Sequence, residues 1–151
     1  MAVTASPHDT VSAHISLITL GVADVAVATR FYEALGFHKS SASQESVSFF
    51  RAGGVVLSVF GREPLAHDAD VLADGSGFRG VTVAMNLPSP EAVDAEYARW
   101  VAVGAVPVKA PQTVFWGGYS SYVADPDGHL WELAHNPYVP LRADGSMDLP
   151  D

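Results

Sequence analysis

Cysteine is missing from this chain of 151 residues. Without a thiol the chain can form no disulfide and perform no thiolate chemistry, which fits a reducing compartment such as the cytoplasm. Basic residues are scarce too, because 8 Lys and Arg stand against 17 Asp and Glu, for a formal net charge of −9. Nucleic acids and anionic membrane surfaces are bound through clustered Lys and Arg, so we expect neither as a partner.

Long apolar runs are absent as well. No stretch approaches the roughly 20 apolar residues that a membrane helix needs, and residues 1–13 lack the basic and apolar segments of a signal peptide. An apolar content of 48% nevertheless argues against disorder, and the length suits one domain with a buried core. We therefore expect a single cytoplasmic domain with a flexible lead-in at residues 1–13.

The first half of the chain shows a strand, a helix and three further strands. Residues 14–20 are apolar and rich in β-branched side chains, which favours a strand. Asp24 is placed to cap a helix over residues 25–35, and Gly36 is placed to end it. The strands that follow are predicted at residues 37–42, 46–51 and 55–60, the last two joined at a Gly-Gly turn.

The second half repeats this order after a polar connection at residues 62–77. A strand is predicted at 78–87, a helix from Ser89 to Val103, and an edge strand at 106–109 because it contains Pro107. The last two strands are predicted at residues 119–124 and 130–135, before a tail at 138–151. The fold class is therefore α+β, with βαβββ modules at about 14–60 and 78–136 in one domain spanning 14–137. Two such curved sheets can enclose a cup.

A tight turn, Asp125-Pro126-Asp127-Gly128, joins the last two strands. The strand after it places Glu132 between Trp131 and Leu133, where a buried carboxylate needs a partner. One interpretation is that a neighbouring donor satisfies Glu132, and the donors considered are Tyr119, Tyr122, Arg79 or an indole. The other is that Glu132 faces a ligand as acceptor, counter-ion or general base, which makes it the candidate catalytic residue.

Candidate ligand-binding residues lie on the predicted strands and on one loop. Gly117 and Gly118 allow a close backbone approach, which would place Trp116 at the rim of a cup. Tyr119 and Tyr122 lie on opposite strand faces, so only one of them is expected to contact the ligand. The complete set of candidates is Phe49, Ser58, Thr82, Trp116, Tyr119 and Tyr122. The alternative is that the aromatic residues belong to the core.

The order of elements, the helix ending FYEALGF and the DPDGHLWELAHNP run resemble the vicinal oxygen chelate superfamily, which includes glyoxalase I, bleomycin resistance proteins and extradiol dioxygenases. The resemblance covers residues 14–137, and the FWGGYSSY block is similar to a glyoxalase-like branch. It implies that the paired modules form a cup-shaped mixed-sheet pseudo-barrel, commonly in a homodimer. In metal-using members, a divalent ion in the cup polarises a substrate with adjacent oxygens.

Carried across residue by residue, the metal site implied by the resemblance matches at one position. The acidic ligand of the last strand corresponds to Glu132. The other positions fall at Leu17 (or Ser16), at Ser58 and within residues 79–82, where no His, Glu or Gln occurs. One ligand does not hold Zn, Ni, Fe or Mn by itself, so no cofactor is expected, and Glu132 is a metal ligand only if a metal is bound. For the histidines we expect exposed or hydrogen-bonded structural roles.

These observations favour a glyoxalase-like or bleomycin-resistance-like protein that binds a small aromatic or hydrophobic organic molecule in its cup. It would act by sequestration or by metal-independent acid–base chemistry at Glu132. Two alternatives stay open. One is a metal-dependent lyase, isomerase or dioxygenase of the same superfamily, and the other is a structural homologue that only dimerises.

Overall fold

The computed structural model describes residues 12–151. The first module consists of β1 (Leu17–Val22), α1 (Val25–Ala34), β2 (His38–Lys39), β3 (Val47–Ala52) and β4 (Val55–Gly61). The second consists of β5 (Thr82–Asn86), α3 (Pro90–Val103), β6 (Val106–Thr113), β7 (Tyr119–Ala124) and β8 (Leu130–His135). The predicted βαβββ repeat is thus confirmed. A short helix, α2 (Arg62–Asp68), lies in the connection, where the sequence predicted only a polar linker.

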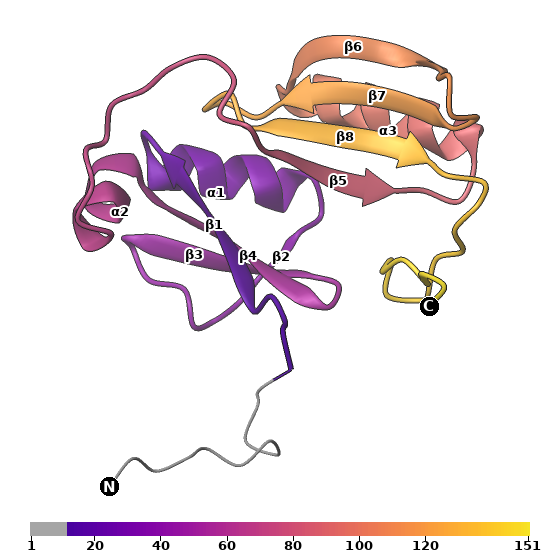
Figure 1. Cartoon of the computed structure of the whole chain (residues 1–151). Coiled ribbons are helices and arrows are strands. Elements are labelled where there is room, and N and C mark those ends of the chain that lie inside the picture. Colours follow the sequence, from indigo (N-terminus) through magenta and orange to yellow (C-terminus); the bar gives the residue numbers. More distant parts are fainter. Residues whose placement is uncertain (1–11) are drawn as a thin grey trace, which may run out of the picture.

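Each module forms a four-stranded mixed sheet. The strand orders are β1-β4-β3-β2 in the first sheet and β5-β8-β7-β6 in the second, and the sheets lie side by side (Figure 1). In each sheet one pair is parallel, β1 with β4 and β5 with β8, and the other pairs are antiparallel. Both β1 and β5 are edge strands, and residues of both line one cavity between the modules. The edge position predicted for β6 from Pro107 is confirmed.

Local chemistry fixes where the two long helices begin and end. Asp24 caps α1 by accepting a 3.1 Å hydrogen bond from the Val27 backbone N–H, and Ser89 caps α3 through the Ala92 N–H at 3.1 Å. Gly104 ends α3 with φ at +118°, a conformation that glycine adopts most readily. Between these ends α1 packs against β3 and β4, and α3 packs against β6, β7 and β8.

An aromatic cluster in the buried core joins the two modules. The rings of Trp100 from α3 and Trp131 from β8 lie 5.1 Å apart, and Tyr32 from α1 lies 5.9 Å from Trp131. Both Trp100 and Tyr32 are fully buried. Because each aromatic side chain removes a large apolar area from water, this shared core holds the modules together.

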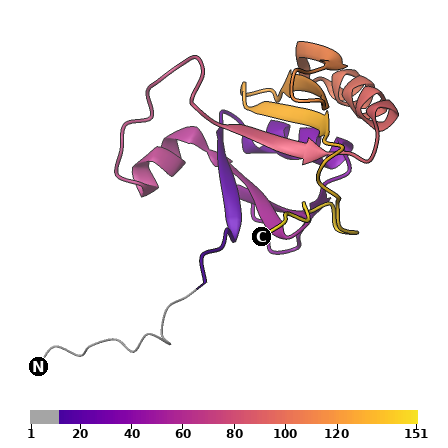
Figure 2. The same cartoon turned by 45° about the vertical axis from the view of Figure 1, so that its right-hand side comes forward.

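The predicted turn at residues 125–128 is confirmed and also bridges the modules. Asp125 accepts 2.9 Å hydrogen bonds from the backbone N–H groups of Asp127 and His129. Asp127 in turn accepts a 2.8 Å bond from the Ala23 N–H of the first module. The C-terminal tail also returns towards the first module (Figure 2), since the Asp144 carbonyl comes close to Gly53 in the β3–β4 turn.

Several strand boundaries differ from the prediction. β1 begins at Leu17 because the pairing of β1 with β4 starts there, between Leu17 and Val56. Positive φ angles at Gly77 and Gly80 break the extended backbone, so β5 begins only at Thr82. The predicted strand at 37–42 contracts to β2, whereas β6 extends to Thr113, where it pairs with Tyr119.

Most of the predicted lead-in at residues 1–13 lies outside the described residues. Within residues 12–151, no helix is both long enough and apolar enough to cross a membrane.

Candidate functional site

Glu132 lies on the face of the second sheet that points away from α3. Its neighbours Trp131 and Leu133 are buried in the core, so the alternation of β8 turns Glu132 to the opposite side. We call this side the outer face of the second sheet and define it by Thr82, Ala84, Ser120, Tyr122 and Glu132. Glu132 is half-buried there, while Thr82 and Ala84 are exposed.

Two hydroxyl groups accompany the Glu132 carboxylate on this face. The Ser120 hydroxyl donates a 2.9 Å hydrogen bond to Oε1 of Glu132. Tyr122 lies directly opposite Glu132 in the antiparallel register of β7 and β8. Burial, and after it the negative charge of Glu132, raises the pKa of Tyr122. The phenol is therefore a neutral hydrogen-bond donor over the whole physiological range.

A cation continues this row of side chains. Lys109 on β6 pairs with Tyr122 in the sheet register and is exposed. Across three adjacent strands the outer face thus carries a carboxylate, a phenol and an ammonium group. Such a row can accept a hydrogen bond, donate one and balance a negative charge, which are the functions needed to orient a small polar group of a ligand.

The implied metal-ligand positions do not fit a divalent ion held by protein side chains. Among residues 12–151, no three His, Cys, Asp or Glu side chains gather in a group able to hold a metal. Ser58 lies on the first sheet between Thr19 and Phe49, and it offers only a hydroxyl. Leu17 offers no donor atom in its side chain. A single carboxylate, Glu132, remains, and zinc and similar ions require three or four strong ligands.

Three histidines hydrogen-bond to the backbone. A ring nitrogen of His129 lies 2.8 Å from the Gly21 carbonyl oxygen, and one of His135 lies 2.9 Å from that of Leu87. His14 makes a similar 2.8 Å contact with the Ser12 carbonyl oxygen. These three histidines are thus hydrogen-bonded, as expected.

Tyr119 lies on the sheet face opposite Glu132, and Trp116 lies in the loop before β7. The Tyr119 hydroxyl donates a 2.7 Å hydrogen bond to Asp94 on α3, so the side chain is on the face opposite Tyr122, as the alternation predicts. That hydrogen bond raises the pKa of Tyr119. Trp116 lies in the β6–β7 loop at 38% exposure, with its indole across Gly118, where any Cβ would overlap the ring.

Phe49 and Ser58 belong to the first sheet, where they pair across β3 and β4. Ser58 is buried, and Phe49 lines a shallow cavity of about 530 Å³. The other lining residues are Ser16, Leu17, Ser40, Ala42, Phe50, Arg51 and Val56. The sequence candidates are therefore not brought together in one site. Thr82 and Tyr122 share the outer face with Glu132, Phe49 and Ser58 lie on the first sheet, Tyr119 lies on the opposite face of the second sheet, and Trp116 lies in a loop.

Sequence reasoning missed Ser120 as the donor to Glu132, although the signal was present. The turn at residues 125–128 fixes the register that pairs Ala124 with Leu130, which puts Tyr122 opposite Glu132 and Ser120 diagonal to it. The four donors considered in its place were Tyr119, Tyr122, Arg79 and an indole. Of these, Arg79 instead donates to the Asp127 carbonyl oxygen at 3.2 Å.

Residues 13–133 match the family model of the Glyoxalase/Bleomycin resistance protein/Dioxygenase superfamily. The chain therefore belongs to this superfamily, as its sequence resemblance predicted. Among curated proteins no match is found.

Solved structures agree with this assignment. A glyoxalase-related enzyme from Fulvimarina pelagi is 32% identical, covers 91% of this chain and 99% of its own, and superposes with a TM-score of 0.81. A glyoxalase/bleomycin resistance protein/dioxygenase from Nocardioides is 29% identical. The match covers 85% of this chain and 87% of the Nocardioides chain, with a TM-score of 0.71. A glyoxalase/bleomycin resistance protein/dioxygenase family enzyme from Burkholderia phytofirmans PsJN is 20% identical. The match covers 82% of this chain and 98% of the Burkholderia chain, and its TM-score of 0.73 supports the fold alone.

Proposed function

We propose that the outer face of the second sheet binds a small organic molecule through Glu132 and Tyr122. The observation that carries this proposal is the half-buried Glu132 carboxylate, hydrogen-bonded to Ser120 on one oxygen and opposite a neutral phenol. A half-buried carboxylate beside a phenol on one sheet face is suited to receive a donor from a ligand.

The chemistry of the row favours a flat molecule that carries hydroxyl groups. Glu132 would accept a hydrogen bond from a ligand hydroxyl, and Tyr122 would donate one to a neighbouring ligand oxygen. Ala84, which pairs with Glu132 in the sheet register and is exposed, offers apolar surface for an aromatic or aliphatic body. The protein would act by sequestering this molecule, or by acid–base chemistry in which Glu132 removes a proton from the bound hydroxyl. Trp116, Phe49 and Ser58 remain proposed contacts from other parts of a cup.

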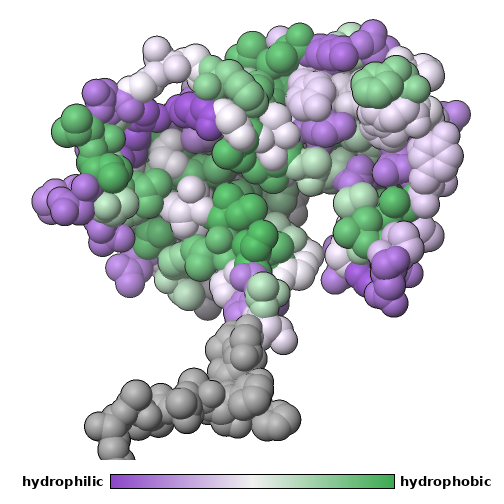
Figure 3. All heavy atoms as spheres, viewed as in Figure 1, coloured by the Kyte–Doolittle hydropathy of each residue, from purple (hydrophilic) through white to green (hydrophobic). Residues whose placement is uncertain are grey.

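A second copy of the chain would complete that cup. Apolar surface gathers over β1 on the side shown in Figure 3. Ile15, just before β1, and Leu17, its first residue, are 65% and 45% exposed. Burying such surface favours association, so we propose a homodimer that works in the cytoplasm. Sedimentation equilibrium of the full chain tests the dimer, and a monomer at micromolar concentration would contradict it.

Catechol is a suitable probe because it is flat and carries two adjacent hydroxyl donors. In ¹H–¹⁵N correlation spectra, catechol is expected to shift amides of β5, β7 and β8, whereas 1,2-dimethoxybenzene, which has no donor, binds more weakly. Glu132→Gln is expected to weaken the binding of catechol about tenfold, which is the effect of losing one charge-assisted hydrogen bond. Asp94→Asn is the matched control, since Asp94 also accepts a hydroxyl hydrogen bond but lies on α3.

Two outcomes would contradict the proposal. One is catechol binding that is unchanged in Glu132→Gln, because the carboxylate would then play no part. The other is unfolding of Glu132→Gln at ordinary temperature without ligand, because Glu132 would then be a structural residue.

A further inference from the structure

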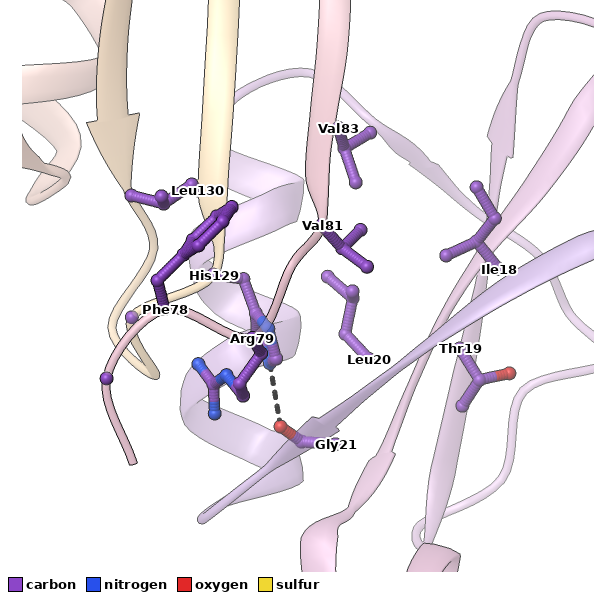
Figure 4. A pocket seen from close by; sticks show the side chains of 12 residues that line it. Ile18, Thr19, Leu20, Gly21, Phe78, Arg79, Val81, Val83, His129 and Leu130 are labelled. Atoms are coloured by element: carbon purple, nitrogen blue, oxygen red, sulfur yellow. Dashed lines mark hydrogen bonds between the residues drawn. The ribbon is translucent and has the colours of Figure 1, made fainter. Parts of the chain in front are cut away.

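A second cavity lies in the seam between the two modules, apart from Glu132. It has a volume of about 470 Å³, within the usual range for small-molecule pockets. Figure 4 shows side chains from β1, from the segment before β5 and from the start of β8 converging on it. We call it the seam cavity and define it by its lining residues Ile18, Thr19, Leu20, Gly21, Gly77, Phe78, Arg79, Val81, Val83, Gly128, His129 and Leu130.

The walls of the seam cavity are mainly aliphatic. Val81 and Val83 face Leu20 and Ile18 across the space between β5 and β1 (Figure 4). Because β1 and β5 each end a sheet, no strand pairing closes this space. An aliphatic chain placed between these residues would remove apolar surface on both sides from water.

One cation, Arg79, lies at the seam cavity. Its Nη2 donates a 3.2 Å hydrogen bond to the Asp127 carbonyl oxygen. This bond uses one of the five N–H donors of the guanidinium group. The ion pairs formed by residues 12–151 are Lys39–Glu33, Arg99–Glu96 and Arg142–Asp148, so Arg79 has no carboxylate partner among them. The nearby Asp127 carboxylate instead accepts the Ala23 N–H. Arg79 is thus available to an external anion.

Two glycines flank the short segment that carries Arg79. Gly77 and Gly80 have φ angles of +75° and +76°, in the left-handed region that favours glycine. Phe78 and Arg79 lie between them, and Phe78 is 71% exposed beside Leu130 (Figure 4). A segment that turns sharply at both ends presents one ring and one cation to the seam cavity.

We propose that the seam cavity binds an amphiphilic carboxylate, with its carboxylate on Arg79 and its aliphatic chain between Val81, Val83, Ile18 and Leu20. The combination of aliphatic walls with a single unpaired guanidinium selects this class over neutral apolar molecules and over cations. This site goes beyond the proposed function, because it uses neither Glu132 nor Tyr122.

Octanoate is the probe that tests the proposal on the full chain. In ¹H–¹⁵N correlation spectra, octanoate is expected to shift amides of residues 18–21, 78–83 and 128–130, and octan-1-ol, which lacks the charge, to bind more weakly. Arg79→Gln is expected to weaken octanoate binding by up to about fivefold, as for loss of an exposed ion pair. Arg30→Gln on α1 is the matched control and is expected to change nothing. Equal octanoate affinity in Arg79→Gln and the parent chain would overturn the proposal.

A cavity-filling variant tests the apolar half of the site. Val81 is 64% exposed, so Val81→Trp can fill the seam cavity without entering the core, and it is expected to abolish octanoate binding. Val106→Trp, at 55% exposure on the far edge strand β6, is the control and should bind octanoate normally. Octanoate binding that survives Val81→Trp would overturn the proposal. Glu132→Gln is expected to leave octanoate binding unchanged, so failure of the two proposals can be told apart.

Discussion

The hydroxyl of Tyr32 donates a 2.6 Å hydrogen bond to the buried carboxylate of Asp125, joining α1 of the first module to the turn of the second. The Trp131 indole N–H donates to the same hydroxyl at 3.1 Å. Asp125 is 1% exposed and keeps its other oxygen on two backbone N–H groups. A carboxylate so deeply buried requires all these donors, so the Tyr32–Asp125 bond couples the modules.

Tyr32→Phe is expected to destabilise the fold by about 1.5–3 kcal/mol, the usual effect of removing a buried hydrogen bond to a charged group. Urea denaturation at pH 7 measures this change. Tyr119→Phe is the matched control, because it removes an exposed tyrosine–aspartate bond of 2.7 Å and should cost much less. Equal losses in the two variants would show that burial does not strengthen the Tyr32–Asp125 bond.

Stability should fall at high pH because of the same residue. Burial and the charge of Asp125 raise the pKa of Tyr32 far above its ordinary value of 10.0. Above pH 10 the unfolded chain releases this proton while the folded chain keeps it. The contribution of Tyr32 is therefore complete below pH 10 and declines by about 1.4 kcal/mol per pH unit above it. Denaturation of Tyr32→Phe between pH 9 and 11 should show a shallower decline than the parent chain, and parallel curves would contradict the assignment.

Asp127→Ala removes the acceptor for the Ala23 N–H and is expected to cost about 1 kcal/mol in unfolding free energy. Asp127→Asn keeps an acceptor oxygen and should retain most of the stability. Thermal denaturation of both variants checks this. If Asn and Ala are equally destabilising, the charge of Asp127 matters rather than its hydrogen bond to the first module.

Elemental analysis after incubation with zinc, nickel, iron and manganese is expected to find no stoichiometric metal, since one carboxylate on the outer face is too small a ligand set. Glu132→Gln should give the same result as the parent chain. A stoichiometric metal that is lost in Glu132→Gln would contradict the ligand assignment and favour a metal-dependent lyase, isomerase or dioxygenase.

Much of the fold could be predicted because its signals are local. Asp24, Ser89 and Gly104 mark helix ends, and the turn at residues 125–128 carries its own acceptor in Asp125. The helix α2 was missed because its Pro64 and polar residues resemble a linker. Its position depends on long-range contacts, with Leu65 packed at Gly21 of β1.

The candidate site was predictable only within one sheet. Strand alternation places Glu132 and Tyr122 on one face, and a fixed turn sets their register. The seam cavity depends on how the two modules sit relative to each other, which is set by ring packing of Trp100, Trp131 and Tyr32. No pattern in either module alone encodes the distance between β1 and β5.

The bonds between the modules have a consequence for a severed chain. The connection at residues 69–80 contains no helix or strand, whereas the modules meet through a buried aromatic cluster and through the turn at residues 125–128. Two fragments made by cleavage within this connection should therefore remain associated and refold together on mixing. The shared core also means that neither fragment can shield its aromatic rings alone, so complementation, rather than independent folding, is the behaviour that this architecture dictates.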